Sequence, residues 1–561
     1  MQNRQALFKI SNLKQWFPLK KKGLYVKAND GIDLTIYQGE TLGLVGESGC
    51  GKSTLGRTLL QLYKQTDGRT MYYGRRLVDV APDYILKTVN NLDKLKRQAT
   101  ELADELAKTQ ENYDALPELE QFKEADRLHT LRRKANAAYL DIVTIIGGLI
   151  VSDDTNRIRS LFTELYKHAD RRHELELKLR VCNVDLQDAE YRMEKGSAKS
   201  KAAVQKYQEK IKEIEAEIAN VEENIAASSK KIQAMKEEYK DAPGFEVAEA
   251  QLDHGIDLAR LTYNEMRHLR VDMQLIFQDP YSSLDSRMTV GQIIGEGMLA
   301  HKFFKKNDDR MKSHVLKIME DCGLAPYFLH RYPHQFSGGQ RQRIGIARAL
   351  ALDPKFIVCD EAVSALDVSI QSQIINLLQE LKDEKNLTYL FITHDLSVVK
   401  YISDRIAVMY LGVIVELADS QDMFKQPLHP YTEALLSAIP SAEEEAAREL
   451  VVLEGDIPSP VNAPPGCKFH TRCRYATEVC KHVVPEFREV LPNHFVACHH
   501  PLNNAEDEAA KRFAAAGLDD KLEGEDKVND PLREAVEAEV TQLEHEVERV
   551  KIEQEGQNPD V

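Results

Sequence analysis

The sequence lacks an excess of basic residues and lacks any long hydrophobic run. Its 74 Lys and Arg residues are outnumbered by 90 Asp and Glu residues, which gives a formal net charge of -16. A general nucleic-acid binder needs a basic face, so this balance argues against nucleic acid as a partner. The longest apolar run, residues 143–151, is far shorter than the roughly 20 residues of a membrane helix, and residues 1–10 show no signal peptide. We therefore expect a cytosolic chain that works at a membrane only through partners.

Paired C-x-x-C motifs are also missing, although the chain has eight cysteines. Four are scattered, and the other four crowd one region with five, six and seventeen residues between them: Cys467, Cys473, Cys480 and Cys498. In a reducing cytosol such a cluster favours a metal site over disulfides. Zinc ribbons use paired cysteines, so the irregular spacing leaves an iron–sulfur cluster, zinc and metal-free thiols as alternatives.

Residues 45–54, VGESGCGKST, follow an apolar stretch that predicts a strand and precede a stretch that predicts a helix. The glycines and Lys52 have the spacing of a phosphate-binding loop. In such a loop, backbone N–H groups surround a phosphate, the lysine reaches the outer phosphates and the hydroxyl of Ser53 holds Mg²⁺. We expect ATP or GTP as the ligand, in contact with Gly46, Glu47, Ser48, Gly49, Cys50, Gly51, Lys52, Ser53 and Thr54.

Several strand ends after residue 270 carry polar residues. Asp360 and Glu361 end a buried strand, where the first carboxylate suits Mg²⁺ coordination and the second suits orientation of the attacking water. Gln278 and His394 end two other apolar strands. A serine and glycines ahead of a helix predict a second anion site, built from backbone N–H groups and the helix dipole. Its residues are Ser337, Gly338, Gly339 and Gln340.

This ordered set of motifs resembles the ATP-binding subunit of ABC transporters over residues 7–78 and 260–420, with FSGGQ in place of the family's LSGGQ. The resemblance implies an α/β fold: an ABC-type P-loop ATPase domain with an antiparallel β subdomain and a helical subdomain. Two such subunits would enclose two ATP molecules, each held by the phosphate loop of one subunit and the FSGGQ segment of the other.

The same resemblance implies roles for single residues. Gln278 would join Ser53 and Asp360 at Mg²⁺ and would couple to a transmembrane partner. Glu361 would act as the base, and His394 would contact the γ-phosphate. An aromatic side chain upstream of the phosphate loop usually stacks on adenine in this family. Tyr25 is the candidate, and Trp16 and Phe17 are the alternatives, because spacing does not distinguish among them.

More than two hundred residues separate Lys52 from Gln278, and the segment 80–258 is a charged insertion poor in Gly and Pro. Apolar residues repeat every three or four positions within 175–193 and 204–239, which predicts an antiparallel coiled-coil hairpin with a turn at 195–200. Arms of about 40 residues would span roughly 60 Å. Helices are also expected over 83–115 and 119–145. Four roles for the insertion stay open. It could contact the membrane subunits, a regulator or a second copy of the chain, or it could have no function.

The order of motifs distinguishes this insertion from another kind of coiled coil. SMC-type and DNA-repair ATPases, which also carry coils inside an ABC domain, have the glutamine segment before the coil. Here Gln278 follows it. The transporter resemblance is therefore retained.

The C-terminal region resembles the extension of dipeptide and oligopeptide importer ATPases. The resemblance is carried by LHPYTEALLSAIP at 428–440, GDIPSPVNAPPGCKFHTRC at 455–473 and HFVACHH at 494–500. It implies a [4Fe-4S] cluster on the four clustered cysteines, with zinc as the alternative. Residues 503–561 are acidic and are expected to be helical or partly disordered.

These patterns divide the chain into five parts: the ATPase domain at 1–79 and 259–423, the insertion at 80–258, the extension at 424–502 and the tail at 503–561. We expect an ATPase that uses ATP and Mg²⁺ to power import of dipeptides or oligopeptides, bound peripherally at the cytoplasmic face of the inner membrane. Expected partners are two transmembrane permease subunits, a second ABC ATPase subunit, identical or related, and indirectly a solute-binding protein. Two alternatives remain: a soluble ABC ATPase that acts as a coiled-coil scaffold, and an importer of the same subfamily for nickel or another small solute.

Overall fold

The computed structural model describes residues 4–21, 23–194, 200–305, 308–439, 451–453 and 455–502. Within them, the larger sheet has the strand order β11-β12-β10-β9-β3-β8-β7-β6, and the strands from β9 to β6 pair in parallel. Its strands are β3 (Thr41–Val45), β6 (Met273–Ile276), β7 (Phe356–Asp360), β8 (Thr388–Ile392), β9 (Arg405–Tyr410), β10 (Val413–Asp419), β11 (Arg488–Leu491) and β12 (His494–Val496).

The central strands of this sheet place the predicted nucleotide loop. Every residue of β3, β7 and β8 is buried, as expected for parallel strands covered on both faces. Helix α1 (Lys52–Leu59) leaves the loop after β3 and contacts β7 and β8. The loop therefore lies at the C-terminal edge of the parallel strands, where ligands bind in open α/β sheets.

A smaller antiparallel sheet has the order β2-β1-β4-β5. Its strands are β1 (Ala6–Pro18), β2 (Tyr25–Tyr37), β4 (Asp67–Tyr72) and β5 (Ile256–Asp257). Tyr72 of β4 pairs with Ile256 of β5. The insertion thus leaves the smaller sheet at one strand and returns to it at the neighbouring strand.

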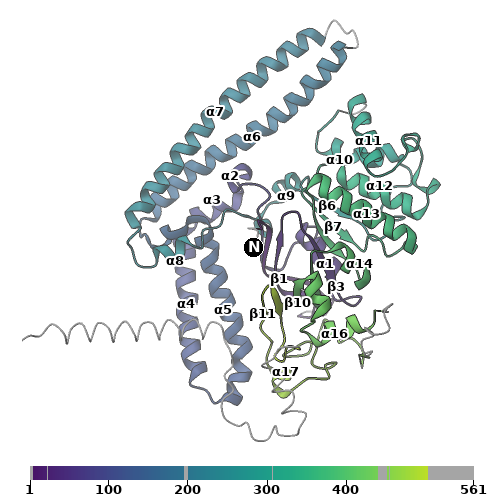
Figure 1. The fold of residues 1–561 in the computed structure, drawn as a ribbon. Helices are drawn as coiled ribbons and strands as arrows, with labels where there is room; N and C mark the ends of the chain where they lie inside the picture. The colour runs from purple at the N-terminus through teal and green to yellow at the C-terminus, as the bar shows by residue number, and fades with distance from the viewer. Residues whose placement is uncertain are drawn as a thin grey trace, which may run out of the picture. The chain divides into compact units, whose positions relative to one another are not determined.

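Helices beside β6 and β7 form a second apolar core (Figure 1). They include α10 (Val290–Ala300), α11 (Asp309–Asp321), α12 (Gly338–Leu350) and α13 (Val368–Lys385). Thr289 begins α10 and Ser337 begins α12, each with a capping box closed by the glutamine three residues later. The remaining helices of this half are α9 (Tyr263–Leu269), α14 (Leu396–Ile402), α15 (Ser420–Lys425) and α16 (Pro430–Ser437).

The insertion is helical in its described residues. Its helices are α2 (Leu77–Val80), α3 (Asp83–Asn90), α4 (Leu92–Asp114), α5 (Glu118–Ile146), α6 (Thr155–Glu194), α7 (Ser200–Tyr239) and α8 (Phe245–Glu249), with a 3₁₀ turn at Gly147–Val151. The helices expected over 83–115 and 119–145 are confirmed as α3, α4 and α5, with a break at Asn91 that the sequence pattern does not show. Residues 195–199 of the predicted turn lie outside the described residues, and so does the tail 503–561.

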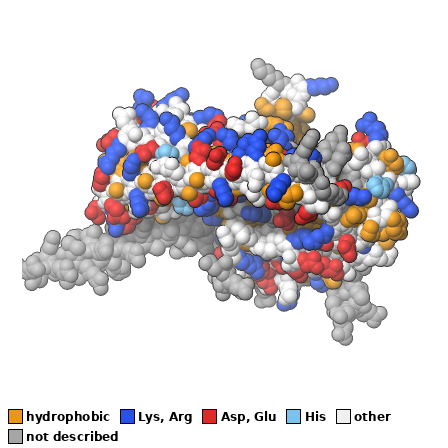
Figure 2. All heavy atoms as spheres, turned by 90° about the horizontal axis from the view of Figure 1, so that it is seen from above, with side chains coloured by type: hydrophobic (Ala, Val, Ile, Leu, Met, Phe, Trp, Pro, Cys, Tyr) orange, Lys and Arg blue, Asp and Glu red, His pale blue; other side chains and the backbone are white. Residues whose placement is uncertain are grey.

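Helices α6 and α7 lie side by side (Figure 1), and their facing residues include Val204, Ile211 and Val221, all buried. Ion pairs join the two helices on the outside, such as Arg171 with Glu217 at 2.6 Å. Figure 2 shows basic and acidic side chains interspersed over this side of the molecule. Since exposed ion pairs contribute little, the buried apolar residues hold the helices together.

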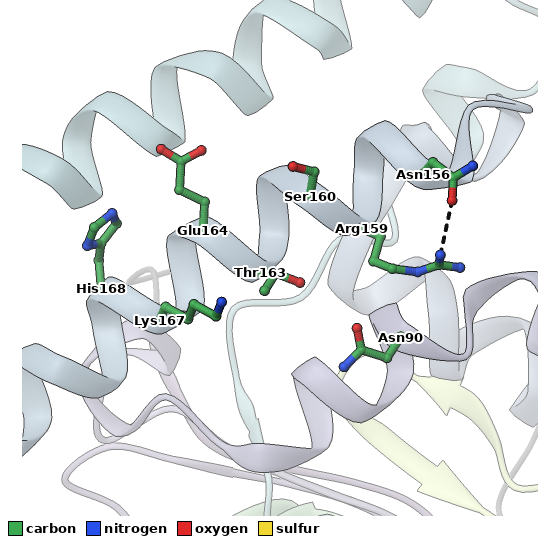
Figure 3. Close-up of a pocket in the computed structure, with 8 residues that line it drawn as sticks. All are labelled: Asn90, Asn156, Arg159, Ser160, Thr163, Glu164, Lys167 and His168. Atoms are coloured by element: carbon green, nitrogen blue, oxygen red, sulfur yellow. Dashed lines mark hydrogen bonds between the residues drawn. The ribbon is translucent and has the colours of Figure 1, made fainter.

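Helix α6 also contacts the helical core beside α11. Lys305 pairs with Asp185 at 2.8 Å and with Asp188 at 3.2 Å, and Arg310 donates to the side chain of Gln187 at 3.0 Å. At the other end of α6, Asn90 of α3 faces Arg159 and Lys167 across a polar groove (Figure 3). The insertion is therefore joined to the smaller sheet at β4 and β5, and α6 contacts the helical core.

One helix of the insertion bears on the expectation that the chain lacks a membrane span. Among the described helices, the segment Arg127–Val151 is long and apolar enough to cross a membrane, although 44% of its most apolar 18-residue stretch is buried inside the protein. The sequence estimate counted only an unbroken apolar run and missed the alanine-rich turns before it. Ile142, Val143 and Ile146 of this segment are fully buried in the fold, which is the pattern of a core helix.

The C-terminal extension is attached to the larger sheet. Val496 of β12 pairs with Glu416 of β10. The Glu416 carboxylate, fully buried, accepts hydrogen bonds from the backbone N–H groups of Leu428 and His429 and contacts Nε2 of His494 at 2.7 Å. A short helix, α17 (Glu478–His482), completes the described part. This extension is thus packed directly against the nucleotide half of the fold.

Candidate nucleotide-binding site

Lys52 begins helix α1 and is 4% exposed. Its ammonium donates to the carbonyl oxygens of Gly46 at 2.7 Å and Glu47 at 3.0 Å. The loop is therefore curled around the ammonium group. A Cβ on Gly46 would lie 2.1 Å from the carbonyl oxygen of Met409, so the backbone of β9 leaves no room for a side chain there.

Ser53 and Asp360, two of the three expected Mg²⁺ ligands, come together from α1 and β7. The Ser53 hydroxyl donates to Asp360 Oδ1 at 2.5 Å, and Asp360 is 1% exposed. Arg57, one turn further along α1, donates to the other carboxylate oxygen at 3.1 Å. Sequence reasoning missed Arg57, although its place four residues after Ser53 puts both side chains on one face of the helix.

The three expected catalytic residues also converge. The amide of Gln278, two residues beyond the end of β6, donates to Glu361 Oε2 at 2.6 Å. The Nδ1 atom of His394, just beyond β8, lies 3.4 Å from Glu361 Oε1. The two side chains thus contact opposite oxygens of one carboxylate. The Glu361 side chain is 13% exposed and that of His394 is 53% exposed, so water has access to the group.

Glu361 has a left-handed backbone with φ of 47°, which residues other than glycine rarely adopt. Its N–H donates to the carbonyl oxygen of Ile392 at 2.9 Å, which fixes the conformation against the neighbouring strand. A strained backbone of this kind persists where the surroundings over-determine it, and such positions cluster at functional sites.

The FSGGQ segment caps α12. Ser337 is exposed, and its hydroxyl accepts from the N–H of Gln340 at 3.4 Å. Gly338 and Gly339 follow in the first turn, where backbone N–H groups have no partner within the helix. Such a helix start suits an anion brought from outside. A neighbouring contact fixes the helix, because Arg341 lies over the ring of Tyr281 at 4.0 Å.

The three aromatic candidates for adenine stacking separate into two groups. Tyr25, 41% exposed, lies beside Trp16, with ring centroids 6.0 Å apart. Phe17 instead packs edge-on against Tyr63 at 5.3 Å. The adenine contact of Tyr25 therefore stays a prediction, and Trp16 shares its surface.

The four clustered cysteines line one small cavity together with His470. Burial raises the pKa of Cys467 and Cys473 to about 11 and also raises that of Cys498. Burial acts the same way on Cys480, but hydrogen bonding to His500 and Thr477 outweighs it and lowers that pKa to about 7. Within the part of the chain that the structure describes, no three His, Cys, Asp or Glu side chains converge closely enough to hold a single metal ion.

Two further contacts to the phosphate loop come from the C-terminal extension. Arg472 pairs with the Glu47 carboxylate, and the Tyr431 hydroxyl accepts from the Glu47 N–H at 2.9 Å. Sequence reasoning found neither, because 425 positions separate Arg472 from Glu47 and no local pattern links them.

Comparisons with known proteins bear on both halves of the chain. The sequence model described as ABC transporter matches residues 29–364, and the one described as oligopeptide/dipeptide transporter, C-terminal region, matches residues 415–480. The chain is 52% identical over 248 residues to the oligopeptide transport ATP-binding protein AppF of Bacillus subtilis (strain 168), a match that covers 44% of this chain and 75% of that protein. It is 51% identical over 249 residues to the oligopeptide transport ATP-binding protein OppF of Salmonella typhimurium, covering 44% and 73%.

Among solved structures, cbiO1 from Clostridium perfringens, described as part of the ABC transporter complex cbiONQ, is similar with a TM-score of 0.38 and 16% identity. That match covers 75% of this chain and 91% of the other. The family resemblance inferred from the motifs is confirmed by the two family matches and by the sequence relatives.

Proposed function

We propose, from the premise that this chain belongs to the ABC transporter family, that it is the ATP-hydrolysing subunit of an importer of dipeptides or oligopeptides. The observation that carries the proposal is the presence, in one chain, of the phosphate-loop ATPase domain and the peptide-importer C-terminal region. Relatives named as oligopeptide transport ATP-binding proteins support it. The protein is an ATPase of mixed α/β fold that uses ATP and Mg²⁺.

Different residues at the phosphate loop bind the phosphates and Mg²⁺. Lys52 and the backbone N–H groups from Gly46 to Thr54 hold the phosphates, and Ser53, Asp360 and Gln278 hold Mg²⁺. Support comes from the contact between Ser53 and Asp360 and from the burial of Asp360. Two-oxygen coordination of this kind suits Mg²⁺, which keeps several waters.

Glu361 accepts the proton of the attacking water. Support comes from its contacts to Gln278 and His394, which orient the carboxylate while leaving it accessible. His394 contacts the γ-phosphate. Catalysis of phosphoryl transfer rests mainly on such positioning and on charge stabilisation.

A second ATPase subunit completes each site. The Ser337–Gln340 segment presents the start of α12 to solvent, so it is available to grip the γ-phosphate bound to another chain. Closure of the two subunits around ATP drives two transmembrane permease subunits, which receive peptide from a solute-binding protein. The chain works at the cytoplasmic face of the membrane, as a homodimer or with a related ATPase.

The insertion 80–258 separates the two parts of the ATPase domain, 1–79 and 259–423, and α6 with α7 form a coiled coil. Support comes from the spacing of buried residues on α7: Val204 and Ile211 are seven apart, and Ile232 and Met235 are three apart. The extension spans 424–502.

The extension holds a [4Fe-4S] cluster on Cys467, Cys473, Cys480 and Cys498. All four line one cavity without converging on a point. A single zinc ion needs its ligands around a point, whereas the irons of a four-iron cluster occupy separate corners, each with its own thiolate. Four thiolates around one cavity are the donor set of a four-iron cluster, and zinc is the alternative. A bound cluster would supply a redox centre and would cross-link distant parts of the extension through its thiolate ligands.

We expect anaerobically purified protein to be brown and to contain about four irons per chain. Cys473→Ser should lose most of the iron and colour, because one thiolate of the set is missing. Cys182→Ser, on α6, is the matched control and should retain both. Iron and zinc are counted by elemental analysis; colourless protein with one zinc, or with no metal, would overturn the cluster.

The function is tested by extracting the tagged full-length chain from native membranes in mild detergent and identifying its stoichiometric partners. Two multi-span membrane proteins and an ATPase partner are expected, together with ATP hydrolysis stimulated by a peptide-loaded binding protein. A soluble complex, or a chain alone, would overturn the importer and favour the scaffold. Stimulation by nickel-loaded binding protein, and not by peptide, would change the cargo.

A further inference from the structure

The phosphate loop is held from outside by the C-terminal extension. Arg472 donates from both terminal nitrogens to the two carboxylate oxygens of Glu47, at 2.8 and 3.1 Å. The arginine side chain is 6% exposed and that of Glu47 is 24% exposed. A forked pair of this kind fixes direction as well as distance, and the low exposure of the arginine limits competition from water.

Arg472 is itself fixed by its own segment. Its N–H donates to the carbonyl oxygen of Phe469 at 2.9 Å. Phe469 is buried and packs against the rings of Tyr410 and Tyr431, with centroids 5.2 and 5.4 Å away. Tyr431 in turn accepts the Glu47 N–H through its hydroxyl. The side chain and the backbone of Glu47 are therefore both anchored to one rigid aromatic cluster.

Glu47 also contacts Lys52, the residue that is predicted to bind the outer phosphates. The carbonyl oxygen of Glu47 accepts from the ammonium of Lys52 at 3.0 Å. A shift of Glu47 thus moves a contact of the lysine that is expected to reach the outer phosphates. The carboxylate of Glu47 would also repel a triphosphate if its charge were not balanced, and Arg472 supplies the balancing charge.

We propose that Arg472 is a positioning residue for ATP binding, which makes the C-terminal extension a structural part of the nucleotide site. The inference rests on the proposed ATPase function and adds to it a residue outside the ATPase motifs. Arg472 acts through Glu47 and touches no reacting atom. Its loss therefore weakens the affinity for ATP more than it slows the hydrolysis of bound ATP.

The test uses the full chain with Arg472→Gln, and Arg474→Gln as the matched control. Arg474 lies two residues away and pairs with Glu433 at 2.9 Å, but it is 51% exposed. We expect Arg472→Gln to raise the Kd and KM for MgATP at least about tenfold, because a largely buried charge pair loses one partner, with kcat changed less than about threefold. Arg474→Gln should match the wild type in all three. Equilibrium binding of a fluorescent ATP analogue and steady-state hydrolysis supply the values.

Two further variants separate positioning from general damage. Arg472→Lys keeps the charge but not the fork and should give an intermediate Kd. The double variant Arg472→Gln/Glu47→Gln removes the unbalanced carboxylate and should bind ATP more tightly than Arg472→Gln alone, a coupling that unfolding would not produce. If Arg472→Gln does not fold, Arg472→Lys carries the comparison.

The outcomes distinguish this inference from the proposed function. A Kd for Arg472→Gln equal to that of Arg474→Gln overturns the inference while the ATPase stands. Equal losses of kcat and of affinity, without rescue in the double variant, also overturn it. A wild-type chain that neither binds nor hydrolyses ATP overturns the proposed function itself.

Discussion

Glu361→Gln should bind ATP normally and lose at least about a hundredfold in turnover, the size expected when a proton acceptor is removed from its place. The glutamine keeps the shape of the side chain, so its carbonyl oxygen can accept from Gln278 while its NH2 group faces Nδ1 of His394. It cannot take a proton from the attacking water. Hydrolysis is therefore lost, whereas phosphate binding around Lys52 remains because it does not involve Glu361.

The measurement is single-turnover hydrolysis at saturating ATP, with binding followed separately. Glu380→Gln is the control, because Glu380 is an exposed glutamate on α13 of the same core and should hydrolyse ATP at the wild-type rate. Hydrolysis by Glu361→Gln within a few-fold of the wild type would refute its role as proton acceptor. A parallel loss of ATP binding would instead show that Glu361 supports the fold of the site.

Residues whose chemistry is tied to a local pattern can be located from the sequence. Lys52 and Ser53 follow a strand and begin a helix, and Asp360 ends another strand with Glu361 just beyond it, so parallel pairing alone brings both pairs to one sheet edge. Each motif carries its own signal of strand, loop or helix. The structure places all four residues, with Gln278 and His394, at that edge.

Contacts made across the chain were not predicted. The pair Arg472–Glu47 depends on how β12 joins β10 and on an aromatic cluster drawn from three segments. The contact of α6 with Lys305 depends on the direction in which the insertion leaves the sheet. A helical period of 3.6 reports which face is apolar, but not which partner covers it. The break at Asn91 was missed for a related reason, because both halves of the segment keep helical composition.

Gly51→Ala should reduce the affinity for MgATP at least about a hundredfold, since a shift of about 1 Å in a positioning group has effects of that size. Gly51 has φ of 107°, and a Cβ there would lie 2.1 Å from the carbonyl oxygen of Ala28 on β2. The clash is with backbone, so neither side can yield by rotating a side chain. The loop must move at the residue that precedes Lys52.

Gly49→Ala is the matched comparison, because it changes a glycine of the same loop that also has a left-handed backbone. Its φ is 80°, but a Cβ there meets nothing within 4 Å. Only backbone strain of about 1–2 kcal/mol opposes this alanine, so we expect a loss of affinity of roughly tenfold or less. Binding of a fluorescent ATP analogue, with thermal unfolding as a check of folding, measures both variants. Equal losses of affinity would mean that strain at left-handed positions controls the loop. A loss confined to Gly51→Ala would show that contact with β2 sets the position of the phosphate loop, in addition to the contacts that Arg472 and Tyr431 make with Glu47.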